Sequence, residues 1–219
     1  MDPFRLCVAL GPLGIFLLLM GVLNLGRRPF LTTGARDTAA LGIALSGLIL
    51  MGPVELLMPR VLLLRFGSFA WLYWLLLASM YCSTLTLLVL SARPRLSMHN
   101  LGLDEARSLL AEVAYKLDPQ FRWTADTLLL PELNVQLHLE GYAPLRAVAL
   151  TPIGPRQSYR GWKELELALT AALRRTETPP NPAGVGLVLS GLMLGGLIAA
   201  RWVADPQAVA KAMVEMLGI

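Results

Sequence analysis

His99 and His138 are the first residues to test for acid–base chemistry, because they are the only histidines in the 219-residue chain. His138 lies between Gln136 and Glu140, so a general base with a carboxylate helper can be envisaged there. Strict alternation of apolar and polar residues already explains His138 as a solvent-facing strand residue. An enzyme acting on lipid at a membrane interface would have to use His138, Asp126 and the segment Arg156–Lys163. We predict no catalytic residue.

The common motifs of hydrolytic, metal-dependent and nucleotide-binding enzymes do not occur in this sequence. It contains no H-E-x-x-H, C-x-x-C, G-x-S-x-G, P-loop or G-x-G-x-x-G pattern. Both cysteines, Cys7 and Cys82, lie in apolar stretches, where neither a disulfide framework nor a zinc site is expected. The sequence therefore predicts no metal site, no cofactor and no enzymatic activity.

One segment combines cations with aromatic residues at the start of a predicted helix. Its candidate contact residues are Arg156, Tyr159, Arg160 and Lys163. The first backbone amides of a helix lack intrahelical partners, so such a segment can bind a phosphate, a lipid headgroup or an acidic partner. The alternative is a solvated loop with Trp162 buried in the core. The two interpretations make opposite predictions for charge reversal at Arg156 and Arg160.

Glu55 is the only charged residue in four long apolar stretches. These stretches are Leu6–Leu25, Thr38–Met58, Ser68–Ser91 and Gly184–Ala200. A carboxylate in mid-membrane is costly and marks a proton or ion site, which would suit a small transporter or channel. Glu55 lies about one helical turn from the predicted end of its stretch, so an interfacial position near Arg60 or Arg65 is the alternative.

The apolar stretches have the length of membrane spans. A helix rises about 1.5 Å per residue and the hydrocarbon core is about 30 Å thick, so roughly 17 to 25 residues cross it. The chain is 55% hydrophobic and only 16% charged. Its net charge of +4 comes mainly from residues flanking the stretches, which contact anionic headgroups and set topology. We expect membrane lipid as a partner and no nucleic acid.

The fourth stretch has the most specific packing pattern in the sequence. Gly191, Gly195 and Ala199 recur every four residues, and Gly186 and Ser190 form an adjacent ridge. Small residues at this spacing let helix backbones approach closely within lipid. The partner of the ridge is either another helix of the same chain or another subunit, so we expect a protein partner or a homo-oligomer.

A polar region between Arg93 and Thr178 predicts a small water-soluble domain. Helical periodicity covers Asp104–Leu117 and Gly161–Arg175, and the period changes to two between them. The predicted strands are Phe121–Thr127, Val135–Glu140 and Leu145–Leu150. A Pro/Asn connector makes the first two strands an antiparallel hairpin. The expected order is α-β-β-β-α, with both helices on one face of a small sheet.

The predicted fold is a mainly α membrane protein with this α+β domain between its third and fourth spans. We divide it into a three-helix membrane region (1–92), the domain (93–178), a Pro-rich joint with the fourth span (179–203) and an amphipathic C-terminal helix (204–219). The Lys/Arg distribution favours a cytoplasmic domain, and the composition favours a bacterial inner membrane. The expected function is a non-enzymatic membrane subunit or scaffold whose domain binds a protein or anionic headgroups.

Overall fold

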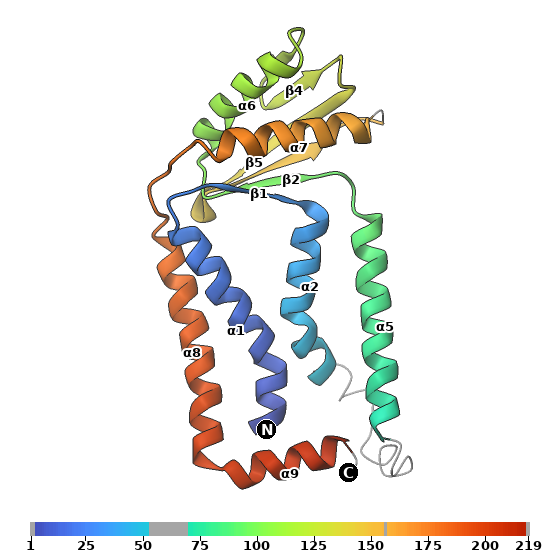
Figure 1. The fold of residues 1–219 in the computed structure, drawn as a ribbon, viewed down its shortest axis with the longest axis vertical. Coiled ribbons are helices and arrows are strands. Elements are labelled where there is room, and N and C mark those ends of the chain that lie inside the picture. Colours follow the sequence, from blue (N-terminus) through green and yellow to red (C-terminus); the bar gives the residue numbers. More distant parts are fainter. Residues whose placement is uncertain (1–2, 53–69, 156, 218–219) are drawn as a thin grey trace. The chain divides into compact units, whose positions relative to one another are not determined.

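The structure is a computed structural model that describes residues 3–52, 70–155 and 157–217. It is mostly helical, with one antiparallel sheet (Figure 1). The chain divides into two compact units. The helical unit draws on the chain up to Met20, between Thr38 and Leu90, and from Gly186 onward. The α/β unit consists of Gly21–Asp37 and Ser91–Val185.

Four described helices are long and apolar enough to cross a membrane. They are α1 (Pro3–Leu25), α2 (Gly34–Met51), α5 (Ala70–Ser91) and α8 (Ala183–Ala204). At 18 to 23 residues they are about 27 to 35 Å long. The predicted C-terminal helix is present as α9 (Pro206–Leu217), directly after Asp205.

Glycines let the backbones of the helical unit approach each other. A Cβ at Gly47 of α2 would collide with the carbonyl oxygens of Val8 and Ala9 in α1. On the other side of α2, the Tyr81 hydroxyl of α5 donates a hydrogen bond to the Gly42 carbonyl at 2.6 Å. An apolar groove of about 430 Å³ lies between α2 and α5. Small residues and the Tyr81–Gly42 hydrogen bond therefore contribute to these contacts, as expected for apolar helices.

The α/β unit contains a six-stranded sheet in the order β1-β2-β6-β5-β4-β3, with every neighbouring pair antiparallel. The strands are β1 (Phe30–Thr33), β2 (Leu96–His99), β3 (Arg122–Thr124), β4 (Thr127–Leu130), β5 (Val135–Tyr142) and β6 (Ala147–Pro152). A short 3-10 turn, η2 (Ala143–Leu145), joins β5 to β6.

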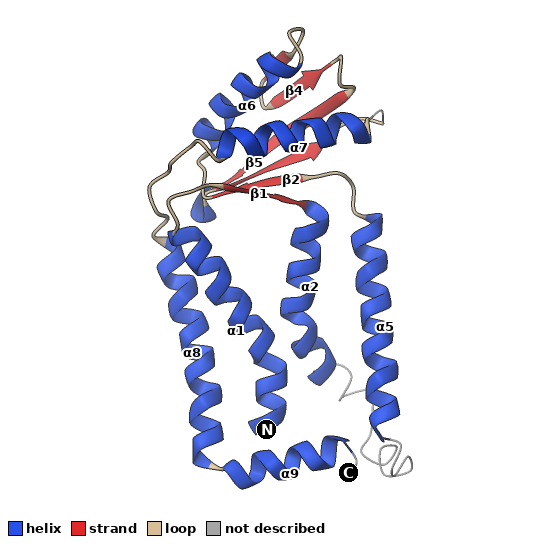
Figure 2. Ribbon diagram, in the orientation of Figure 1, coloured by secondary structure: helices blue, strands red, loops and turns tan. Residues whose placement is uncertain are grey.

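Two helices, α6 (Leu103–Leu117) and α7 (Tyr159–Leu173), cover one face of this sheet, as the sequence predicted (Figure 2). Alternation places every second strand residue beneath them, as in β5, where Val135, Leu137 and Leu139 are buried. The helices contribute Leu110, Leu165 and other apolar side chains to the same core. The opposite face carries the polar members of each strand.

The sequence predicted three strands, and this number was wrong. The run Phe121–Thr127 is not one strand, because a turn with Ala125 at φ 52° splits it into β3 and the start of β4. The predicted hairpin connector is correct, since Leu130 pairs with Val135. β1 and β2 were missed because four residues are too few to show alternation, and β1 gains its partner from a region more than sixty residues away.

Asp118 ties the end of α6 to the turn between β4 and β5. It is fully buried, and its two carboxylate oxygens accept hydrogen bonds from the backbone N–H groups of Gln120 at 3.0 Å and Glu132 at 2.8 Å. Since each oxygen satisfies an amide that has no strand or helix partner, Asp118 replaces water in the interior.

Replacing Asp118 should destabilise the α/β unit by more than any surface carboxylate does. Asp118→Ala leaves two amides unsatisfied, at a cost of about 1 to 3 kcal/mol for each buried polar group left unpaired. Asp126→Ala is the matched control, because it removes only a half-exposed ion pair with Arg107. Thermal unfolding of the full-length protein in detergent, followed by near-UV circular dichroism, measures the difference. Equal melting temperatures for the two variants would contradict this role of Asp118.

Candidate functional site

The predicted cationic segment lies at the start of α7 and is open to solvent. Ser158 caps the helix by accepting a hydrogen bond from Gly161 N–H at 3.2 Å. Tyr159 is 77% exposed and Lys163 is also exposed. The Arg160 guanidinium pairs with Glu164 one turn along the helix, at 2.9 Å. Arg156 lies outside the described residues.

Trp162 and Gln157 fix the loop in front of this helix. Trp162 is buried in the core, as the alternative interpretation of the segment required. Its indole N–H donates to Gln157 Oε1 at 2.9 Å, while Gln157 Nε2 donates to the carbonyls of Gln136 and Ile153. The Gln157 amide is therefore occupied on both its oxygen and its nitrogen. Sequence reasoning missed this residue, because one glutamine in a polar loop gives no pattern.

The loop forms one side of a groove, and Arg93 and Pro94, which follow α5 in the chain, form the other. This Arg93 groove has a volume of about 480 Å³ and is lined by Arg93, Pro94, Pro152, Gly154, Pro155 and Gln157. Pro94 and Pro152 lie at the end of the β2–β6 pair, where the ladder stops at Leu96 and Leu150. The fold thus brings Arg93 into contact with the same groove as the predicted segment, a juxtaposition that sequence spacing does not reveal.

Several cations of the α/β unit are paired with carboxylates of the same unit. Among them, Lys116 donates to Glu112 at 2.6 Å, and this hydrogen bond holds the pKa of Glu112 below its usual value. Arg107, Arg146 and Arg160 also have carboxylate partners. Some arginines near the ends of the apolar helices are exposed and form no ion pair with a carboxylate in the described part of the chain. They are Arg27, Arg28, Arg36, Arg93 and Arg95.

His99 belongs to a cluster that only the fold assembles. Its ring stacks on Phe30 of β1, with centroids 4.8 Å apart. Nε2 lies 3.2 Å from Thr32 Oγ1 and 3.8 Å from an oxygen of Asp37 in the first turn of α2. A catalytic triad needs the acid on one ring nitrogen and the hydroxyl on the other, whereas both groups here approach Nε2. The cluster therefore joins β1, β2 and α2 and lacks the geometry of a triad.

His138 and Asp126 are separated by their side-chain directions. His138 lies on the sheet face opposite α6 and α7, paired with Thr127 and Thr151. The Asp126 carboxylate instead binds Arg107 at 2.5 Å. Among the described residues, no three His, Cys, Asp or Glu side chains gather as metal ligands. Glu55, the candidate intramembrane site, lies outside the described residues.

The small-residue ridge of α8 divides into a packed part and an open part. A Cβ at Gly191 would lie 2.7 Å from Leu18 Cγ and 3.0 Å from the Gly14 carbonyl oxygen, so this position packs on α1. Cβ atoms at Gly186 and Gly195 would meet nothing within 4 Å. The other two ridge residues, Ser190 and Ala199, are exposed, and the Ser190 hydroxyl donates to the Gly186 carbonyl of its own helix.

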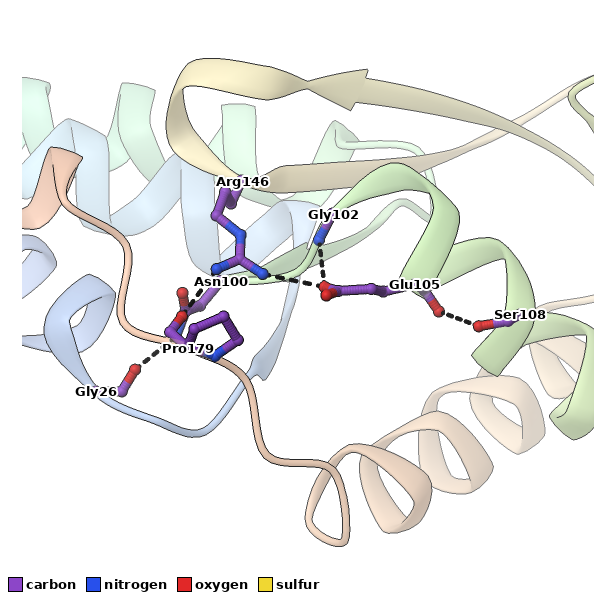
Figure 3. Close-up of polar contacts among 7 residues, drawn as sticks. All are labelled: Gly26, Asn100, Gly102, Glu105, Ser108, Arg146 and Pro179. Carbon is purple, nitrogen blue, oxygen red and sulfur yellow. Dashed lines mark hydrogen bonds and ion pairs between the residues drawn. The ribbon is translucent and has the colours of Figure 1, made fainter.

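A polar clasp holds the Pro-rich joint against the rest of the α/β unit (Figure 3). Arg146 donates to the Pro179 carbonyl at 2.8 Å and to Glu105 at 3.1 Å. Asn100 is fully buried in a left-handed conformation that asparagine tolerates, and its amide donates to the Gly26 carbonyl at 2.6 Å. Backbone bonds from Thr178 to Arg27 and from Asn181 to Asn24 complete the attachment. The clasp has a positioning role, and among its described atoms the buried Asn100 Oδ1 and Thr178 Oγ1 have no hydrogen-bond partner.

No protein-family model, curated protein or solved structure matches this chain. The functional argument therefore rests on the geometry and chemistry described above.

The two halves of the α8 ridge should respond differently to the same substitution. Gly191→Ala should lower the melting temperature in detergent, because the new methyl collides with Leu18, and overpacking costs about 1 to 3 kcal/mol. Gly195→Ala is the matched control and should be neutral or stabilising, because alanine has the higher helix propensity and no atom is in its way. A larger loss at Gly195 than at Gly191 would show that this packing is wrong.

Removing the clasp should loosen the joint without unfolding the domain. Arg146→Ala deletes the hydrogen bond to Pro179, so amide hydrogen exchange at Thr178 and Asn181 should become faster. Arg107→Ala serves as the control, because it removes the partly exposed ion pair with Asp126, which is distant in sequence from the joint. Unchanged exchange at Thr178 and Asn181 would rule out Arg146 as the residue that holds the joint.

Proposed function

We propose that this chain is a multi-pass integral membrane protein that acts without catalysis as a subunit or scaffold of a membrane assembly. In this proposal the four apolar helices are the anchor, and the α/β unit is the interaction module at the bilayer surface. The single observation that carries the proposal is the position of strand β1 in the chain. It lies between two apolar helices and nevertheless forms the edge of the domain's sheet.

The connections between helices and sheet support an anchored domain. β1 is followed directly by α2, and only four residues separate α1 from β1. β2 begins five residues after the end of α5. The joint that leads from α7 to α8 is fixed to Asn24 and Arg27 by backbone hydrogen bonds. The chain thus passes between the domain and the apolar helices four times, which suits a scaffold better than a catalytic domain on a single tether.

The open part of the α8 ridge supports a helix partner. Apolar helices associate in lipid through small residues, and Gly186 and Gly195 have no neighbour within reach of a Cβ. In our proposal a helix of a second copy or of another subunit packs there. The exposed arginines at the domain ends of the helices favour a cytoplasmic domain by the positive-inside rule.

Two experiments, carried out one after the other, test this function. Resistance of the native protein to alkaline carbonate extraction is the result expected for an integral membrane protein, and release into the supernatant would refute the anchor. The mass of the particle extracted in mild detergent should then exceed that of one chain. Gly195→Leu should reduce this mass, whereas Ala78→Leu on the exposed side of α5 should leave it unchanged. A monomeric native particle with flux or lipid-converting activity would overturn the proposal.

A further inference from the structure

We propose that the Arg93 groove binds the phosphate-bearing headgroup of an anionic phospholipid. The inference rests on the proposed insertion of α5 into the bilayer, and it adds a defined lipid site to the proposed function. Three properties of the groove lead to it: its place along the chain, the chemistry of its lining and the charge of its surroundings.

The groove lies at headgroup depth if α5 spans the membrane. The helix is 22 residues long, or about 33 Å, which matches the hydrocarbon core. Arg93 follows the last helical residue, Ser91, by two positions, so its Cα lies within about 7 Å of the helix end. The headgroup region extends roughly 5 to 7 Å beyond the hydrocarbon on each side. The Arg93 guanidinium therefore reaches the layer in which lipid phosphates lie.

Among the described residues that line the groove, one side chain is left for polar recognition. Pro94, Pro152 and Pro155 have no backbone N–H, so they offer a ligand no amide donor. The Gln157 side chain already serves Trp162, Gln136 and Ile153. Arg93 is exposed and forms no ion pair with a carboxylate in residues 3–52, 70–155 and 157–217. A planar guanidinium with five donors beside apolar proline rings fits a phosphate attached to a glycerol backbone.

The surrounding charge favours an anion held at a membrane over a free one. Arg95 lies two residues beyond Arg93, and Arg36 follows β1, the neighbour of β2; both side chains are exposed. Arginines at an anionic membrane surface each add to the attraction for acidic lipids, and this attraction falls off within a Debye length. Free phosphate in solution would gain only the single contact at Arg93. The bilayer, in contrast, supplies headgroups at high local concentration next to all three side chains.

The test compares lipid selection by the full-length protein and by two charge-reversed variants. Each protein is reconstituted into nanodiscs made from equal parts of phosphatidylcholine and phosphatidylglycerol, and the lipids that stay bound after transfer to detergent are counted by native mass spectrometry. The native protein should retain phosphatidylglycerol preferentially. Arg93→Glu should lower this preference by about fivefold or more, and Arg93→Lys should keep part of it. The control Arg122→Glu makes the same charge change on the exposed edge strand β3 and should have no effect.

The other outcomes separate this inference from the proposed function. Equal preference in the native protein and in Arg93→Glu would refute the lipid site, as would equal losses in Arg93→Glu and Arg122→Glu, which would mean a response to net charge alone. Displacement of phosphatidylglycerol by inorganic phosphate at ordinary buffer concentration would assign the groove to free anions and refute the lipid site. Failure of the native protein to enter nanodiscs would refute the membrane anchor itself.

Discussion

The backbone ladder between β1 and β2 is the interaction on which the rest of the structure depends. It pairs Phe30–Thr33 with Leu96–His99 in antiparallel register, and Gly34 N–H extends it by donating to the Arg95 carbonyl at 2.7 Å. Through this ladder the segment between the first two apolar helices becomes part of the sheet. It also satisfies the backbone N–H and C=O groups that a strand without a neighbour would leave unpaired.

The same pairing assembles the polar groups around it. His99 meets Thr32 and Phe30 because β1 lies beside β2, and it approaches Asp37 because α2 begins where β1 ends. Arg36 and Arg95 are brought to one end of the sheet by the same register. The Arg93 groove forms where β2 and β6 end together and the chain turns toward α7. Charge at the helix ends is thus arranged by strand pairing, since Arg36 follows β1 and both Arg93 and Arg95 precede β2.

Much of the fold follows from local pattern. Within the described residues, the first, third and fourth apolar helices, α6, α7 and the C-terminal helix appear close to their expected bounds, since each is long enough for composition or a 3.6-residue period to be decisive. The second apolar stretch is present as α2, and its predicted end at Met58 lies outside the described residues. β5 and its hairpin with β4 were also predictable, because Val135 to Leu139 alternate strictly and a proline-containing turn precedes them. The burial of Trp162 followed from its place on the apolar face of α7.

By itself, the sequence determined which segments are apolar enough to be helices of membrane length and which polar region folds into sheet and helices, because these properties depend on residues near one another in the chain. Only the tertiary structure decided that Phe30–Thr33 is a strand, that Gly191 packs while Gly195 stays open, and that Arg93 shares a groove with Gly154 and Gln157. The physical reason is that these outcomes depend on partners distant in sequence. A four-residue strand, one glycine or one arginine carries no local sign of the neighbour that gives it its role.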